Sequence, residues 1–184
     1  MMLSDRQKAA LLQLARDAIQ ASLRGEPEVT PPATPEPGLA GMQAGVFISL
    51  HVGGELRGCI GSIEHTRPLL DSVCAMAVAA ACNDPRFEPL RLEELPDTRI
   101  EISVLTPLQA LRNLQDLQIG KHGVMIRLGK RHGLLLPQVA AQRGWDAGTF
   151  VRHVCRKAGL PEDAWQDPKA ELLYFSAEVF SDQP

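Results

Sequence analysis

One β-hairpin pattern constrains the fold more than any other feature of the sequence. Apolar residues alternate with other residues over 46–52, which predicts a strand that buries one face. Gly53-Gly54 follows, and two successive glycines supply the positive φ angles of a tight hairpin turn. The return strand should cover 55–63, where Gly58 and Gly61 indicate a β-bulge or a close approach of another backbone. The chain is therefore expected to build an antiparallel sheet.

A capped helix and a proline-rich connector precede this hairpin. Ser4 can accept a hydrogen bond from the first turn of a helix, and Gln7 completes a capping box, so a helix is expected within residues 1–25. Residues 26–41 are rich in proline, which forms neither helix nor sheet ladder, and they are expected to be an extended connector. Residues 42–184 should then form an α+β domain, with the N-terminal helix packed on it to give a single domain overall.

The rest of the chain alternates short strands with helices. Further elements are expected, in chain order, as a helix over 68–82, a strand over 99–105, a hairpin over 117–136, a helix over 149–158 and a strand over 171–180. Hairpins outnumber βαβ units in this order, so the predicted fold class is α+β, with a mainly antiparallel sheet and packed helices. No further functional tail is expected after the last strand, where the chain reads Ser-Asp-Gln-Pro.

Composition and charge argue against several classes of protein. The 184 residues are 45% hydrophobic and 22% charged, as in an ordinary globular domain. The formal charge is -3 and aromatic residues make up 4%, so nucleic-acid binding is not expected. No apolar run approaches the roughly 20 residues that cross a bilayer, so no membrane span is expected. Charged residues stand where a signal peptide would have its apolar core, which predicts a cytoplasmic protein.

The four cysteines are expected to be free thiols, because the cytosol keeps thiols reduced. None belongs to a Cys-x-x-Cys pair, and no histidine lies at a zinc-site spacing from one, so no metal site is expected. The five histidines show no triad spacing, and the sequence identifies no cofactor. Cys74, Cys82 and Cys155 lie in apolar helical patterns and are expected in the core.

Cys59 is the strongest candidate for chemistry. A cysteine becomes reactive where positive charge or backbone N–H groups favour its thiolate. Arg57 lies two residues away, so on a regular strand the two side chains would share a face. Gly58 and Gly61 would let the main chain turn its amides toward an anion. The alternative is that Cys59 is a small hydrophobic residue in a bulged and tightly packed strand.

Two further segments carry groups that could assist Cys59. Asp84 and Arg86 flank a proline directly after the Ala-rich helix, where a rigid turn could place a proton acceptor and a clamp for an anion. The alternative is a helix stop with a local ion pair between the two residues. Glu101 projects from the face of its strand opposite Ile100 and Ile102, so it lies either in a cleft or in solvent.

The residues around Cys59 resemble a known family. The sequence Leu-Arg-Gly-Cys-Ile-Gly-Ser at 56–62 is similar to the signature of the AMMECR domain family, whose bacterial and archaeal members are called AmmeMemoRadiSam system protein A. The likeness extends from about Gly45 to Phe180. Further blocks resemble the family in the same order, at 83–90, 101–106, 133–140, 144–146, 157–160 and Trp165.

This resemblance implies an α+β fold with a smaller second lobe, and it implies that the loop 57–61 and the turn at Asp84 and Arg86 belong to one surface region. The family name also associates the chain with Memo-like proteins and radical SAM enzymes as partners. Two functions follow as hypotheses. The first is an enzyme, or a component of an enzyme system, whose Cys59 acts on an anionic small molecule or a modified protein group. The second is a binding or adaptor module without catalysis.

Overall fold

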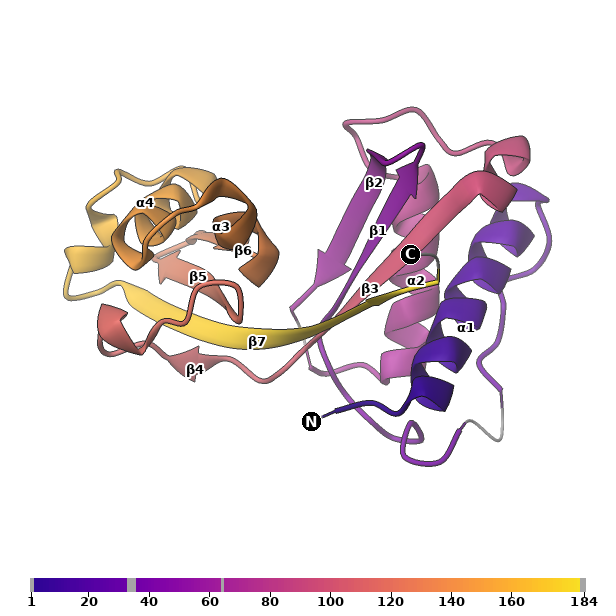
Figure 1. Ribbon diagram of the computed structural model, residues 1–184, viewed down its shortest axis with the longest axis horizontal. Helices are drawn as coiled ribbons and strands as arrows, with labels where there is room; N and C mark the ends of the chain where they lie inside the picture. Colours follow the sequence, from indigo (N-terminus) through magenta and orange to yellow (C-terminus); the bar gives the residue numbers. More distant parts are fainter. Residues whose placement is uncertain (1, 33–35, 64, 183–184) are drawn as a thin grey trace. The chain divides into compact units, whose positions relative to one another are not determined.

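The computed structural model describes residues 2–32, 36–63 and 65–182 (Figure 1). The chain divides into two compact units, of which the first comprises 1–105 with 178–184 and the second comprises 106–177. Pro35 of the expected connector and the last two residues of the chain lie outside the described residues. The predicted division at residues 25 and 41 falls within the first unit and stays a prediction.

The first unit is a sheet covered on one face by two helices. Strands β1 (Val46–Val52), β2 (Glu55–Ser62) and β3 (Thr98–Leu105) pair antiparallel in the order β2-β1-β3. The C-terminal residues of β7 (Glu171–Ser181) continue this sheet beside β3. Helices α1 (Asp5–Leu23) and α2 (Leu69–Cys82) pack against each other and against the sheet (Figure 1).

Local sequence explains both helices. Ser4 accepts a hydrogen bond from the N–H of Gln7, the Gln7 side chain accepts one from the N–H of Ser4, and this predicted capping box begins α1. The alanines of α2 let its backbone approach the sheet closely. Six of the fully buried side chains in this unit form the layer between the helices and the strands, namely Leu11, Ile19, Ile48, Leu50, Ile100 and Ile102.

The second unit has its own core. Strands β5 (His122–Leu128) and β6 (Arg131–Leu135) form a hairpin, β7 pairs with β5, and the short β4 (Gln109–Ala110) pairs with β7. Helices α3 (Pro137–Arg143) and α4 (Ala147–Lys157) accompany them, with short 3-10 turns at 114–116 and 164–166. Phe150, Val151 and Val154 of α4 are fully buried in this core.

The predicted α+β class with an antiparallel sheet is confirmed, and the second unit is the smaller lobe. The alternation at 46–52 gives β1 with the predicted bounds, and both Gly53 and Gly54 have positive φ. Among the described residues, five elements were not predicted: α3, β4, the 3-10 helix η1 (Leu92–Asp97) and the 3-10 turns at 114–116 and 164–166. Within the described residues, no helix is long and apolar enough to cross a membrane.

Candidate functional site

The face of the first sheet that points away from the helices carries polar and reactive side chains. The pairing register of β2, β1 and β3 sets them in three rows. From β2 to β3 the rows are Gly61–Phe47–Ser103, Cys59–Ser49–Glu101 and Leu56–His51–Arg99. Side chains directly opposite each other on neighbouring strands lie within contact reach. The sheet therefore brings the thiol of Cys59, the hydroxyl of Ser49 and the carboxylate of Glu101 into one row.

The Cys59 thiol has a hydrogen-bond donor beside it. The hydroxyl of Ser49 lies 3.2 Å from Sγ and donates to it. Ser49 is buried, whereas Cys59 is half-buried and is a free thiol. A hydroxyl in this position stabilises negative charge that develops on sulfur. Ser49 was not among the predicted site residues, although the alternation over 46–52 places it opposite the apolar residues and was the signal that could have found it.

Asp84 connects Cys59 to the turn after α2. Its carboxylate accepts hydrogen bonds from the backbone N–H of Cys59 at 2.9 Å and from the backbone N–H of Arg86 at 3.1 Å. The Arg86 guanidinium adds two more, at 2.9 Å from Nε and 2.6 Å from Nη2. Asp84 is buried, with 4% of its surface exposed. The Arg86 side chain, followed by the two backbone N–H groups, holds the pKa of Asp84 far below its usual range.

Arg86 is the arginine that lies next to Cys59. Its Nη2 also donates to the backbone carbonyl of Cys59 at 3.2 Å, and its guanidinium lies 5.3 Å from the centre of the Phe87 ring. The Asp84 carboxylate is the main cause that raises the pKa of Arg86, and Cys59 contributes to the same effect. The Arg86 side chain is 53% exposed, so a ligand in solvent can reach a guanidinium that Asp84 keeps in place.

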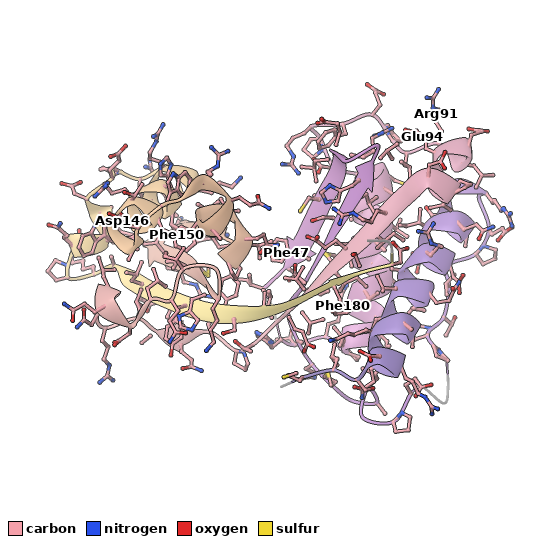
Figure 2. The ribbon with its side chains drawn as sticks, in the orientation of Figure 1. Phe47, Arg91, Glu94, Asp146, Phe150 and Phe180 are labelled. Atoms are coloured by element: carbon pink, nitrogen blue, oxygen red, sulfur yellow. The ribbon has the colours of Figure 1, made fainter. Side chains whose placement is uncertain are left out.

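Arg57 takes a different direction. The pairing of β1 with β2 shifts between Leu50 and His51, so that His51 pairs with Leu56 and Arg57 is the extra residue of a β-bulge. The expectation that Arg57 and Cys59 share a face assumed unbroken alternation, which this bulge interrupts. The Arg57 guanidinium forms a bidentate pair with Glu94, at 3.0 Å and 3.1 Å. Figure 2 labels Glu94 in the 3-10 turn that precedes β3.

The Arg57 guanidinium also closes the loop that follows α2. Its Nη1 and Nη2 donate to the backbone carbonyls of Glu88 at 2.6 Å and Pro89 at 3.2 Å. The Arg57 side chain is the first cause that lowers the pKa of Glu94 to about 2, and the backbone N–H of Arg91 is the second. Arg57 therefore holds the loop 88–94 against β2. Glu94 was not among the predicted site residues, since nothing in the sequence links it to a strand about 40 residues earlier.

The two glycines that flank Cys59 allow close packing. A Cβ atom at Gly58 would lie 2.1 Å from the backbone carbonyl oxygen of Ala80 in α2. A Cβ atom at Gly61 would lie 2.2 Å from the ring of Phe47 and 2.6 Å from the carbonyl oxygen of Val46. The predicted bulge and the close backbone approach are thus both present. Neither glycine has a positive φ. The backbone N–H of Cys59, which follows Gly58, donates to Asp84.

His51 and Glu101 complete the polar face. Burial, followed by the neighbouring Arg99, lowers the pKa of His51, while Glu101 acts in the opposite direction. Glu101 is half-buried, in register with Ser49, so it lies in the same row as Cys59. Of the predicted site residues, Cys59, Asp84 and Arg86 are in direct contact, Glu101 is on the same face, and Arg57 is directed elsewhere. No group of three or more metal-ligating side chains occurs among the described residues.

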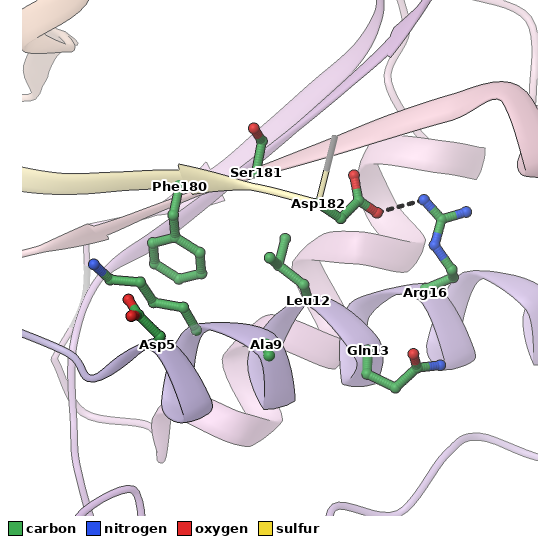
Figure 3. Close-up of a pocket in the computed structure, with 9 residues that line it drawn as sticks. Asp5, Ala9, Leu12, Gln13, Arg16, Phe180, Ser181 and Asp182 are labelled. Atoms are coloured by element: carbon green, nitrogen blue, oxygen red, sulfur yellow. Dashed lines mark hydrogen bonds and ion pairs between the residues drawn. The ribbon is translucent and has the colours of Figure 1, made fainter. Parts of the chain in front are cut away.

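A separate open pocket on α1 has its charges paired internally. Its walls include Lys8, Arg16, Phe180 and Asp182, and Figure 3 shows the Arg16–Asp182 contact across it. That ion pair measures 2.5 Å, and Lys8 pairs with Glu178 at 2.9 Å. Because these charged groups already neutralise one another, this pocket offers a ligand fewer available charged groups than the row around Cys59 does.

Comparison with known proteins identifies the family. The sequence model of the AMMECR1 family matches residues 12–180, and the chain belongs to this family. A protein of Methanothermobacter thermautotrophicus is 41% identical over 176 residues, which cover 92% of this chain and 91% of that protein. Protein MK0488 of Methanopyrus kandleri is 40% identical over 182 residues, covering 94% and 87%.

A solved structure agrees with the fold. The crystal structure of uncharacterized protein PH0010 from Pyrococcus horikoshii superposes with a TM-score of 0.93 at 36% identity, and the match covers 98% of this chain and 94% of that one. The predicted family and fold class are therefore confirmed. The names of these relatives state no reaction, so the function has to be argued from the site.

Proposed function

We propose that this chain acts as AmmeMemoRadiSam system protein A, a cytoplasmic enzyme or enzyme-system component that uses the Cys59 thiol on an anionic small molecule or a modified protein group. The observation that carries the proposal is the pair of groups around the sulfur. Ser49 donates to Sγ at 3.2 Å, and Arg86, held by Asp84, binds the carbonyl of the same residue. A thiol flanked by a fixed donor and a fixed cation suits nucleophilic attack on a substrate that carries an anion.

Each site residue has a distinct role in this proposal. Cys59 is the nucleophile, and the exposed part of the Arg86 guanidinium binds the carboxylate or phosphate of the substrate. Asp84 positions Arg86 and the Cys59 backbone; its lowered pKa keeps it ionised, so it serves as an anchor. Glu101, in the row of Cys59, accepts the thiol proton through Ser49 or water.

The remaining residues shape the site. Arg57 holds the loop 88–94 in place and thereby supports the turn that carries Arg86. Gly58 and Gly61 let the strand lie close to α2 and to the Phe47 ring. The reaction is a displacement: Sγ forms a bond to the electrophilic carbon while the leaving group departs with the electrons of its own bond, and the thiol proton passes to Glu101 or to water.

Two matched alkylating agents test the proposal. Iodoacetate carries a carboxylate and iodoacetamide is its neutral analogue, so the ratio of their rates at one thiol reports positive charge next to that thiol. We expect this ratio at Cys59, measured by mass spectrometry on the native protein, to exceed the ratio measured for the unfolded chain. Arg86→Gln should lower it several-fold, whereas Arg112→Gln, which removes an exposed arginine of the second unit, should not.

Two results would overturn the assignment of Cys59 as the nucleophile. One is a Cys59 that stays unmodified until the protein unfolds, and the other is a ratio that Arg86→Gln leaves unchanged in a folded variant. Cys59→Ser should fold normally and abolish function, because it keeps the shape of the site and removes the thiolate. A normally folded Cys59→Ser protein with full function would exclude Cys59 as the nucleophile.

The second candidate function is a binding or adaptor module that works with Memo-like and radical SAM proteins. The engagement of Arg57, Asp84 and Gly58 in internal packing favours it, since the same contacts would simply stabilise a rigid docking surface. On this view Cys59 is a packing residue. If the chain is an adaptor, Arg86→Gln should weaken capture of such partners from a lysate, and Cys59→Ser should not. If the chain is an enzyme, Cys59→Ser should abolish turnover and leave the partners bound.

A further inference from the structure

A second concavity of the first unit lies on the side of its helices and is separate from the row around Cys59. It has a volume of about 700 Å³ and lies between α1, α2 and the first part of the connector. Its lining runs from Ala18 to Pro31 on one side and from Arg67 to Asn83 on the other. This volume is within the range of sites for small ligands.

One face of α2 supplies the floor of this groove. Asp71, Ala75, Val78 and Ala79 recur at helical spacing and all line it. The three apolar members are half-buried. Because alanine side chains are short, α1 and α2 leave a valley between them that the protein's own side chains do not fill. Val29 of the connector adds an apolar wall.

The rim of the groove carries more negative than positive charge, with Glu26, Glu28 and Asp71 against Arg67. Glu28 from the connector and Asp71 from α2 are exposed and line the groove, and among the described residues neither forms an ion pair. Glu26 is 3.8 Å from Arg24, and Arg67 is the one arginine of the lining. In the pocket of Figure 3, by contrast, Arg16 is paired with Asp182, and Lys8 of the same pocket is paired with Glu178 nearby.

The ends of two helices add to this negative potential, and the Cys74 thiol on the floor responds to it. The C-terminal ends of α1 and α2, at Gly25 and Asn83, both border the groove, and helix C-termini carry partial negative charge on their free carbonyls. Within the groove, burial raises the pKa of Cys74 to about 11, with Asp71 as the next cause and smaller contributions from Asp17 and Glu28. The carboxylates of three different elements therefore act on one point of the floor.

We propose that this groove binds a small aliphatic cation, that is, an alkyl amine or alkyl guanidine, with its apolar arm on Ala75, Val78 and Ala79 and its charged head between Glu28 and Asp71. An apolar floor with a net acidic rim fits a ligand that has both an alkyl chain and a positive charge. The volume of the groove suits a free small molecule. A protein partner would instead need a contact surface of roughly 1,000 Å² or more. The site is independent of the function proposed for Cys59.

Three ligands that share one alkyl arm test the site. 1-Aminopentane is a cation at pH 7, 1-pentanol is neutral and pentanoate is an anion. We expect titration of the full chain with 1-aminopentane, followed by ¹H–¹⁵N correlation spectra, to shift the amide signals of residues 18–31 and 67–83 saturably. Pentanol should bind at least fivefold more weakly, and pentanoate should give no saturable shift.

Paired variants separate the groove from general electrostatics. Glu28→Gln with Asp71→Asn should weaken 1-aminopentane about tenfold, as expected for two lost contacts to a carboxylate. Glu93→Gln with Asp97→Asn removes two exposed carboxylates outside the groove, so the net charge changes equally and the affinity should stay the same. Equal weakening in both pairs, or signal shifts spread over the whole surface, would overturn the proposal. The proposal would also be overturned if a lysine-containing peptide bound to the groove while 1-aminopentane caused no signal shifts there.

Discussion

The carboxylate of Asp84 accepts the backbone N–H of Cys59 at 2.9 Å, from a turn 25 residues further along the chain. Arg86 donates back to the carbonyl of Cys59, so the outer edge of β2 is satisfied at this residue by two side chains of one turn. An edge strand would otherwise leave these two backbone groups unpaired. The same pair of contacts fixes the position of the sulfur relative to the Arg86 guanidinium.

Asp84→Asn should destabilise the protein by about 2–3 kcal/mol, because it removes a buried charge that accepts four hydrogen bonds and leaves Arg86 without its counterion. The melting temperature should fall by about 5–10 °C for a chain of this length. Urea unfolding followed by circular dichroism measures the change. Glu93→Gln is the control, since this exposed side chain should change stability by less than about 0.5 kcal/mol. Equal stability of the two variants would contradict the anchoring role of Asp84.

Stability should fall at acid pH through Glu94. Its pKa is lowered from 4.5 to about 2 in the folded protein, first by Arg57. The unfolded chain therefore binds this proton as the pH falls through about 4.5, while the folded chain does so only near 2. The contribution of Glu94, about 1–2 kcal/mol for a partly exposed bidentate pair, is complete above about pH 5 and is lost between pH 4.5 and 2.

Urea midpoints of the wild type and Glu94→Gln at pH 7, 5, 3.5 and 2.5 test this dependence. The two proteins should differ most at pH 7 and converge at pH 2.5. A Glu93→Gln control should run parallel to the wild type throughout. A constant difference between the wild type and Glu94→Gln at all four pH values would show that the pair with Arg57 does not cause the lowered pKa.

Much of the first unit could be predicted from local patterns. Alternation gave the bounds of β1, the capping box gave the start of α1, and the pairing of His51 with Leu56 follows from a two-residue turn. The missed helix α3 has only seven residues, although Pro137 at its first position was a usable signal. Such a short helix depends on tertiary packing more than on its own sequence.

The contacts of the site were harder to predict, because they join distant segments. The direction of Arg57 depends on a bulge and on Glu94, and neither can be located without the structure. The row that includes Ser49 and Glu101 was implicit in the strand alternation, but only the register of β1 with both neighbours brings them beside Cys59. The resemblance to the family placed Cys59, Asp84 and Arg86 in one region, and the hydrogen bonds agree with it.

Gly58→Ala should be strongly destabilising, by roughly 3 kcal/mol or more, because its Cβ would lie 2.1 Å from the carbonyl oxygen of Ala80 and both atoms belong to rigid backbone. Gly148→Ala is a suitable comparison. A Cβ at Gly148 meets only the end of the Arg152 side chain at 3.6 Å and a carboxylate oxygen at 3.8 Å, and alanine favours the helical conformation of α4. That variant should be neutral or more stable by about 0.5 kcal/mol. A Gly58→Ala protein as stable as the wild type would mean that β2 and α2 can separate at little cost.

The cysteines should differ in reactivity in an order that their surroundings determine. Burial and the neighbouring Asp71 raise the pKa of Cys74 to about 11, so only about 0.1% of it is thiolate at pH 8. Its alkylation by iodoacetamide should accelerate about tenfold per pH unit between 8 and 10. Asp71→Asn should speed this reaction at pH 8, because it removes the carboxylate that acts most strongly on the sulfur.

Cys155 is fully buried and its pKa is raised by that burial, so it should react only when the protein unfolds. Cys59, half-buried beside Ser49 and Arg86, should be modified before either. Mass spectrometry of peptides sampled over time gives all three rates from one experiment. If Cys74 reacted at pH 8 as fast as a cysteine in the unfolded chain, its burial and its acidic surroundings could not together raise its pKa, and an Asp71→Asn variant with an unchanged rate would contradict the effect of Asp71. A slow Cys59 would count against the site on β2 alone.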